Sequence, residues 1–136
     1  PEEIVALDLR HPRRRQMLEL LRERWHGTVI GPRLVSCQAG QLNLYVDVNG
    51  VVFPCVSARS TSWPLDRTRL RESLREIFYH EFPRLREQPV AEPYPCGECA
   101  LHYLCMGCHA WRELEMGTAM LPCPFNCRLG QLRPKL

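Results

Sequence analysis

The sequence lacks a long apolar run and a large excess of charge. No stretch of its 136 residues reaches the ~18 consecutive apolar residues of a membrane-spanning helix, and no signal peptide opens it. The net charge is only +3, which does not predict the basic surface of a nucleic-acid-binding protein. Lysine occurs once, as Lys135, against 17 arginines. We therefore expect a cytoplasmic protein whose partners include neither a membrane nor a nucleic acid.

The chain is short and begins with a proline instead of a methionine, so we expect it to be a piece of a longer protein. Its length leaves room for one modest hydrophobic core, and small cores usually need disulfides or metals to stabilise them. Cysteine is the residue that can do this here, because the chain contains eight of them.

The eight cysteines fall into three groups. A central group follows the pattern C-x2-C-x5-C-x2-C, one pair precedes it and another pair follows it. The groups are Cys37 and Cys55, then Cys96, Cys99, Cys105 and Cys108, then Cys123 and Cys127. This order predicts two four-thiolate sites that share the central group, instead of two separate fingers.

The spacing also bears on the metal. Soft thiolates select zinc or iron–sulfur clusters, whereas disulfides require an oxidising compartment. Five residues between the two central pairs are few for a zinc ribbon, which normally places a hairpin there. In two-cluster ferredoxins, three close cysteines hold one cluster and the fourth crosses to the other. The pattern therefore favours iron–sulfur clusters over zinc, and zinc over disulfides.

Local patterns predict a small α+β fold. Apolar residues at helical spacing indicate a helix over 11–26, with Pro12 in its first turn and Gly27 just after its end. Alternating residues around Asn49-Gly50 predict a β-hairpin over 42–55. This hairpin folds the chain back, so it can bring Cys37 and Cys55 to one end.

The second half predicts two more helices. One covers 66–87, with a capping-box pattern at Ser73 and Glu76 and an interruption at Pro83. The other covers 109–116 and ends at Gly117. Three prolines between 89 and 95 indicate an irregular linker, and the tail after Cys123 is expected to loop over whatever the cysteines hold.

Taken in order, these motifs resemble the SPASM domain, the C-terminal auxiliary-cluster module of many radical S-adenosylmethionine enzymes. The resemblance covers roughly residues 35–127. It includes C-x12-G-x4-C from Cys37 to Cys55, the stretch 45–55, Ser73 to Ile77, and the central cysteines. It implies a two-cluster domain over 29–136, and that residues 1–28 are a connecting helix at the end of an upstream radical S-adenosylmethionine barrel.

The resemblance implies two 4Fe–4S clusters. The inner cluster takes Cys37, Cys55 and Cys108, and the outer cluster takes Cys96, Cys99, Cys105 and Cys127. Two features depart from the family. Only Met106-Gly107 separates the last two central cysteines, where three residues are usual, and there are two late cysteines instead of one. Cys123 can complete the inner cluster, replace Cys127 in the outer one, or bind nothing.

The implied function is that of an auxiliary module in an enzyme resembling peptide-modifying maturases. Its clusters would relay an electron or anchor a peptide or protein substrate through an open iron. The radical-generating C-x3-C-x2-C motif is absent, since Gly130 stands where its last cysteine would be after Cys123 and Cys127. We therefore expect no catalytic residue here, and S-adenosylmethionine to bind only to the full-length oxidoreductase, on the barrel of the same polypeptide.

A structural zinc-binding module that binds a partner protein without catalysis is the alternative. Around the thiols, His102 and His109 are expected to face solvent or to form hydrogen bonds, and not to act as ligands. Arg112 and Arg128 lie near ligands in the sequence, and such arginines can tune a cluster's potential, although surface arginines usually do not.

Overall fold

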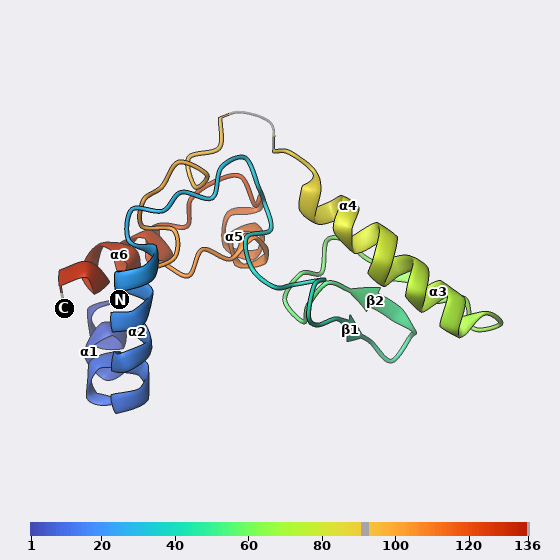
Figure 1. Ribbon diagram of the computed structural model, residues 1–136, viewed down its shortest axis with the longest axis horizontal. Helices are drawn as coiled ribbons and strands as arrows, with labels where there is room; N and C mark the ends of the chain where they lie inside the picture. The colour runs from blue at the N-terminus through green and yellow to red at the C-terminus, as the bar shows by residue number, and fades with distance from the viewer. Residues whose placement is uncertain (91–92, 136) are drawn as a thin grey trace.

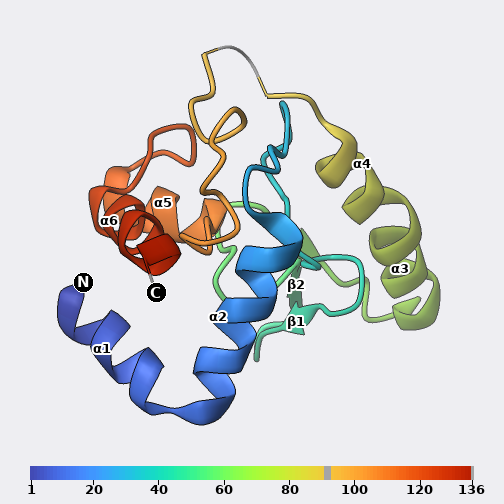
Figure 2. The same ribbon diagram turned by 60° about the vertical axis from the view of Figure 1, so that its left-hand side comes forward.

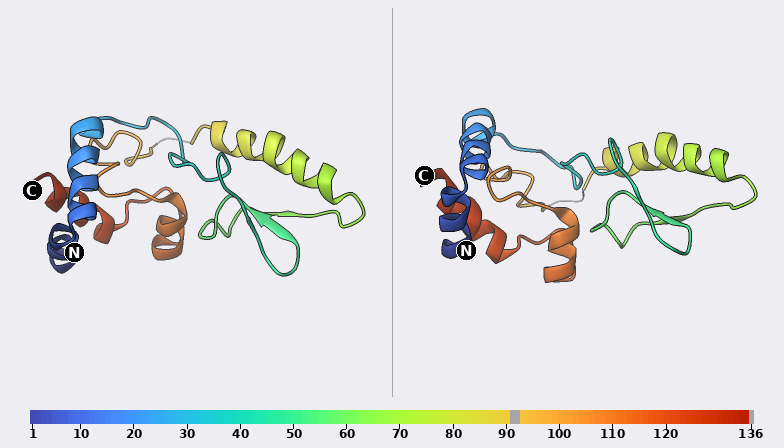
Figure 3. Two further views of the ribbon diagram at one scale, coloured as in Figure 1. Left: turned by 60° about the horizontal axis from the view of Figure 1, so that its bottom comes forward. Right: turned by 90° about the horizontal axis from the view of Figure 1, so that it is seen from below.

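The structure is a computed structural model that describes residues 1–90 and 93–135, the last of these by its backbone. Figure 1 shows a small sheet with helices α3 and α4 at one end of the molecule, α1, α2 and α6 at the other, and α5 between them. We call the first part the sheet lobe (residues 38–90). The second part is the cysteine lobe (residues 1–37 and 93–135). Both views of Figure 3 place the two lobes at opposite ends and the two termini together in the cysteine lobe.

Helices and strands are short throughout. The strands are β1 (Tyr45–Val46), β2 (Val51–Phe53) and β3 (Trp63–Pro64), in one antiparallel sheet of order β1-β2-β3. The helices are α1 (Glu2–Arg10), α2 (Pro12–Trp25), α3 (Leu70–Glu76), the π-helical turn η1 (Ile77–Glu81), α4 (Phe82–Glu87), α5 (His109–Met116), α6 (Pro124–Leu132) and the 3-10 turn η2 (Arg133–Lys135). The predicted α+β class is confirmed.

The hairpin forms as predicted but is shorter, because β1 begins only at Tyr45 and pairs it with Phe53. Of the two turn residues, only Gly50 has a positive φ, at 79°. The carboxylate of Asp47 explains the difference. It accepts hydrogen bonds from the backbone N–H groups of Asn49 and Val51, both at 2.9 Å, and so holds a turn in which Asn49 has no positive φ.

The long helical segment continues through Pro83 instead of breaking there. A proline has no N–H to donate and crowds the preceding turn. The chain accommodates it with the π-helical turn η1, in which Phe82 donates to the carbonyl of Ile77. The predicted capping box is wrong, because Arg69 precedes the first helical residue. Ser73 lies inside α3, where its hydroxyl accepts from the backbone N–H of Asp66 at 3.1 Å.

The apolar core lies in the sheet lobe, between β2 and the underside of η1 and α4. Val52 and Phe82 are fully buried there and Ile77 nearly so, and the Trp63 ring meets the Phe82 ring edge-on with centroids 5.3 Å apart. A Cβ atom at Gly40 would lie 3.0 Å from Phe82, so the chain before the hairpin passes directly over this core. The core therefore stabilises one lobe only.

The cysteine lobe buries polar side chains as well as apolar ones. The polar ones are Asp8, His102, His109, Arg112 and Arg133, each at most 7 % exposed, and the apolar ones include Val5, Leu18 and Leu104. Helix α1 contacts both α2 and α6, and Figure 2 shows α1 and α2 diverging from the short connection between them. Burying charged side chains is costly unless they are paired and hydrogen-bonded, so this lobe depends on its polar contacts.

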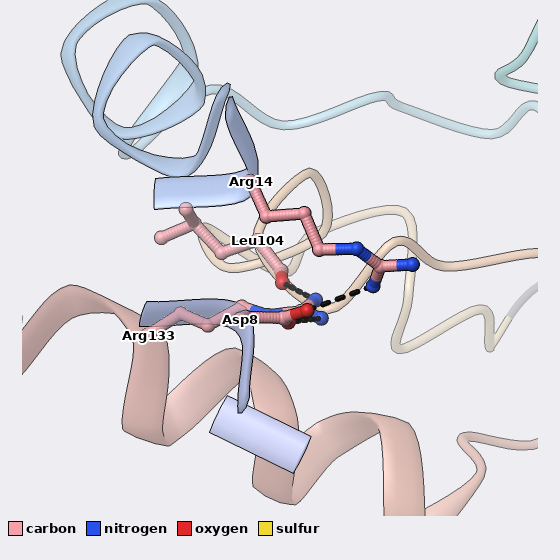
Figure 4. A network of polar contacts seen from close by, with 4 residues as sticks. All are labelled: Asp8, Arg14, Leu104 and Arg133. Carbon is pink, nitrogen blue, oxygen red and sulfur yellow. Dashed lines mark hydrogen bonds and ion pairs between the residues drawn. The ribbon is translucent and has the colours of Figure 1, made fainter. Parts of the chain in front are cut away.

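One buried ion pair joins the two ends of the chain. The carboxylate of Asp8 on α1 lies 3.2 Å from Nη2 of Arg133, and it also accepts a 2.8 Å hydrogen bond from Arg14 (Figure 4). Nη1 of Arg133 donates to the carbonyl of Leu104 at 2.6 Å, within the central cysteine segment. Residues 1–28 are thus packed on the C-terminal helix and on the cysteines.

Several sequence-based expectations meet the structure directly. The helices predicted over 11–26 and 109–116 are confirmed as α2 and α5, and Gly27 and Gly117 follow them with positive φ. The tail forms helix α6 and η2 in place of the predicted loop. Part of the predicted linker, residues 91 and 92, lies outside the described residues. Over the described ranges, no helix is long and apolar enough to cross a membrane.

Candidate metal centre

The central cysteine segment, residues 94–108, is built from successive tight turns. Gly97 donates to Tyr94, His102 to Cys99, and Cys105 to Leu101, all through the backbone at 2.9–3.1 Å. These turns contain neither helix nor strand, so the four cysteines of the segment project from irregular backbone. Such a segment needs outside support to keep a fixed shape.

The chain after α2 supplies that support. Gly31 donates to the carbonyl of Gly97 at 3.0 Å, and Gly27 donates to that of Ala100 at 3.1 Å. The contact requires a glycine at 97, because a Cβ atom there would lie 2.6 Å from the carbonyl oxygen of Gly31. The ring of Trp25 also stacks on Tyr103 with centroids 4.6 Å apart. The first pair of central cysteines is therefore held between the 27–31 segment and the rest of the lobe.

Burial raises the pKa values of three thiols of the predicted outer set. It raises that of Cys105 to about 12, and Cys99, Cys127 and Cys96 add to the rise. Burial also raises the pKa values of Cys96 and Cys127. Cys99 adds to both of these rises, and Cys96 and Cys123 add to the rise at Cys127. The three thiols come from two segments, 96–105 and helix α6.

Helix α6 brings the last of these thiols into place. Cys123 precedes the helix, Pro124 occupies its first turn, and Cys127 lies one turn along, donating its N–H to the carbonyl of Cys123. One turn later Gly130 lies against Cys105, where a Cβ atom would come within 2.8 Å of the Cys105 Cβ. The close approach of α6 to Cys105 explains why Cys127 lies near the central cysteines.

Replacing Gly130 with alanine tests this approach. The added methyl group forces α6 away from Cys105, so we expect a loss of about 1–3 kcal/mol in unfolding free energy, as for other overpacked sites. We also expect a lower metal content of the purified protein. Gln131→Ala, at an exposed position on the same helix, is the matched control and should leave both quantities unchanged. Equal behaviour of the two variants in urea unfolding and metal analysis would contradict this packing.

The predicted inner set is less enclosed. Cys37 is exposed and Cys55 half-buried. Gly40 donates its N–H to the carbonyl of Pro54 at 3.0 Å, which places the chain just after Cys37 beside the residue before Cys55. Arg86 of α4 fixes the same segment by donating to the carbonyl of Ala39 at 2.8 Å. The backbone thus brings the segments of Cys37 and Cys55 together, as the hairpin argument predicts.

Cys108 immediately precedes helix α5, and that helix lies near the segment that follows Cys55. The hydroxyl of Ser60 donates to the Glu113 carboxylate at 2.6 Å, which links the two elements. The connection from Cys105 to Cys108 is tight. Met106 adopts a left-handed φ of 54°, which no other non-glycine residue shares in 1–90 and 93–135. The two-residue spacing therefore carries backbone strain at Met106.

Two observations describe the state of the cysteine thiols in this structure. All eight cysteines are free, so none forms a disulfide. Within residues 1–90 and 93–135, no group of three or more histidine, cysteine, aspartate or glutamate side chains is arranged to hold a metal ion. A tetrahedral zinc site with Zn–S bonds of about 2.3 Å needs its thiolates close together. The described thiols form no such compact group in this structure.

Both nearby histidines are buried. The ring of His102 shares a 2.8 Å hydrogen bond with the hydroxyl of Ser36, and it packs against Gly107. Burial lowers the pKa of His102 to about 4, and burial also lowers the pKa of His109. The hydrogen bond of His102 agrees with the structural role expected from the sequence.

The two arginines singled out in the sequence have different surroundings. Arg128 is half-exposed and forms an ion pair with Glu2 at 2.7 Å, so it serves to join α6 to α1. Arg112 is buried, at 2 % exposure. It donates to the carbonyl of Ala119 at 2.8 Å and to the hydroxyl of Tyr94 at 2.6 Å. Its burial could not be read from the sequence, where it lies on a short amphipathic helix.

Helix α6 thus packs on Cys105 through Gly130, and the chain segments that carry Cys37 and Cys55 lie next to each other. In comparisons with known proteins, no family model, no curated protein and no solved structure matches this chain.

Proposed function

We propose that this chain is an auxiliary iron–sulfur module of a radical S-adenosylmethionine enzyme. Cys96, Cys99, Cys105 and Cys127 hold the outer 4Fe–4S cluster in this proposal. The observation that carries it is the packing of α6, which bears Cys127, on the central cysteines: a Cβ atom at Gly130 would lie 2.8 Å from the Cβ of Cys105. The four cysteines are those that the SPASM resemblance selects.

The same observation bears on the two late cysteines. Cys127 lies in the turn of α6 before Gly130, the residue that packs on Cys105, which supports Cys127 as the fourth outer ligand. Cys123 lies one turn before it, at the start of α6, and is 4 % exposed. We therefore assign the outer position to Cys127.

Cys37, Cys55 and Cys108 hold the inner cluster in this proposal. Three protein ligands leave one iron open, and the exposure of Cys37 supports a position that another molecule can reach. A cluster of this kind supplies one-electron transfer, or an iron that binds a substrate group. The chain's own residues position it: the hairpin holds Cys37 near Cys55, and α5 begins at Cys108. The substrate class is a peptide or protein side chain, modified by the radical that the barrel of the longer enzyme generates.

The spacing of the central cysteines also favours a cluster over a single zinc ion. Only five residues separate the two central pairs, where a zinc ribbon normally places a hairpin. Zinc bound by an interaction module without catalysis is the outcome that would replace this proposal.

Metal and sulfide analysis of anaerobically purified protein tests the function. We expect about eight irons and eight sulfides per chain, since each of the two clusters contributes four of each. Cys127→Ala should lower both counts to about four, whereas Cys123→Ala should keep the outer cluster. One or two zinc ions per chain and no acid-labile sulfide would contradict the proposal and support the zinc module.

A further inference from the structure

Arg112 is the largest fully buried side chain of the described residues, and it is a cation. It projects from α5, which begins immediately after Cys108. Burying a charged group in a protein is costly unless other groups compensate its charge and satisfy its hydrogen bonds. The surroundings of Arg112 therefore need to explain why a guanidinium occupies this position.

The protein provides hydrogen-bond acceptors for only some of the nitrogen atoms of this guanidinium. Nε donates to Ala119 and Nη2 to Tyr94, but Nη1 is buried and has no hydrogen-bond partner among the described residues. None of the ion pairs formed within 1–90 and 93–135 includes Arg112. Its two acceptors are a carbonyl and a phenol, so no carboxylate neutralises its charge. Arg133, the other deeply buried arginine, differs because Asp8 pairs with it.

Tyr94 links Arg112 to the first central cysteine. Its hydroxyl accepts a hydrogen bond from Arg112, and its ring packs against Gly97, the residue after Cys96. The backbone N–H of Arg112 also donates to the carbonyl of Cys108 at 3.0 Å. The unneutralised cation is thus tied to both ends of the central cysteine segment.

We propose that Arg112 is the internal counter-charge of the outer cluster, and that Nη1 donates a hydrogen bond to one of its sulfur atoms. This inference rests on the proposed function. A four-iron cluster with four thiolates is an anion that gains one further negative charge on reduction. A fixed cation and an N–H···S hydrogen bond stabilise the reduced form more than the oxidised one, and so raise the reduction potential.

A purely structural role for Arg112 makes a different prediction. If the guanidinium only holds α5 to Tyr94 and Ala119, its loss lowers stability but leaves the cluster potential where it was. The reduction potential of the outer cluster distinguishes the two roles. It is measured by redox titration followed by electron paramagnetic resonance. The outer cluster is identified as the signal that Cys105→Ala removes.

Arg112→Met is expected to make the outer cluster at least about tenfold harder to reduce, which is about 59 mV for a one-electron couple. Arg112→Lys retains the charge and should restore most of that shift. Arg128→Met is the matched control, because Arg128 adjoins Cys127 in the sequence but pairs with Glu2 at the surface. It should leave the potential unchanged.

Labelling arginine with nitrogen-15 tests the hydrogen bond in the wild-type chain, even if Arg112→Met does not fold. Pulsed electron paramagnetic resonance of the reduced protein should detect coupling between the outer cluster and an arginine nitrogen, and Arg112→Lys should abolish it. Two intact clusters with no arginine coupling, or with an unchanged outer potential in Arg112→Met, would overturn this inference alone. Protein that holds zinc and no sulfide would overturn the proposed function itself.

Discussion

Protein carrying Cys105→Ala is expected to contain about four irons and four sulfides per chain instead of about eight. Burial raises the pKa of Cys105 to about 12, and α6 packs directly on this residue through Gly130. Alanine removes the ligand but adds no bulk at this contact. The inner cluster should remain, because its three cysteines lie in other segments or at the start of α5.

Leu104→Ala is the matched control for this loss. Leu104 precedes Cys105 and is 1 % exposed, so its truncation should cost about 2–5 kcal/mol of stability. It removes no thiol, however, and the folded fraction should retain about eight irons. If Cys105→Ala also retains eight irons, or if both variants lose iron equally, Cys105 is not a ligand of the outer cluster.

Asp8→Ala is expected to destabilise the cysteine lobe by roughly 3–5 kcal/mol, because it leaves Arg133 buried without its counter-charge. The pair is 3.2 Å long and both side chains are 6 % exposed. It connects α1 to η2, and through Arg133 to the carbonyl of Leu104 beside Cys105. Its loss should therefore loosen the lobe that carries the cysteines while leaving the Val52 and Phe82 core intact.

Native-state hydrogen exchange of the cluster-loaded protein measures this effect by segment. Protection should fall in α1 and α6 and persist in β2 and α4. Glu19→Ala is the control, since Glu19 also accepts from a helical arginine, Arg15, but at an exposed position. Breaking that pair should cost no more than about 0.5 kcal/mol. Similar losses of protection in the two variants would show that the buried pair does not hold the lobe together.

Local signals were sufficient to predict part of the fold. Pro12 begins α2, and Gly27 and Gly117 follow the ends of α2 and α5. A proline fits the first turn of a helix, and a glycine adopts the left-handed conformation that often follows the last turn. Helix α6 was missed because the two prolines around Cys123 were interpreted as loop residues, although Pro124 occupies a first helical turn.

Other elements depend on contacts that are distant in the sequence. Strand β3 has two residues and contains Pro64, so it exists only because it pairs with β2. Helix α3 begins at Leu70 and not after Ser73. The Ser73 hydroxyl accepts a hydrogen bond from the backbone N–H of Asp66 instead of capping a helix that starts at Ser73. The buried pair of Asp8 and Arg133 joins residues separated by 125 positions. No local pattern reports such a contact.

The candidate site shows the same division. The order of the cysteines predicted an outer set drawn from the central group and one late cysteine. It could not choose between Cys123 and Cys127, because that choice depends on how α6 packs against Cys105 through Gly130. The burial of Arg112 likewise depends on Tyr94 and Ala119, which meet it only in the folded chain.

Mössbauer spectroscopy of anaerobic wild-type protein, loaded with the Mössbauer-active isotope of iron, tests the central claim most directly. The account predicts that nearly all the iron gives the signals of 4Fe–4S clusters, in an amount that corresponds to two per chain. The Arg112→Met protein should keep those signals. A colourless wild-type protein whose metal is zinc, or whose iron lacks sulfide, would contradict the account.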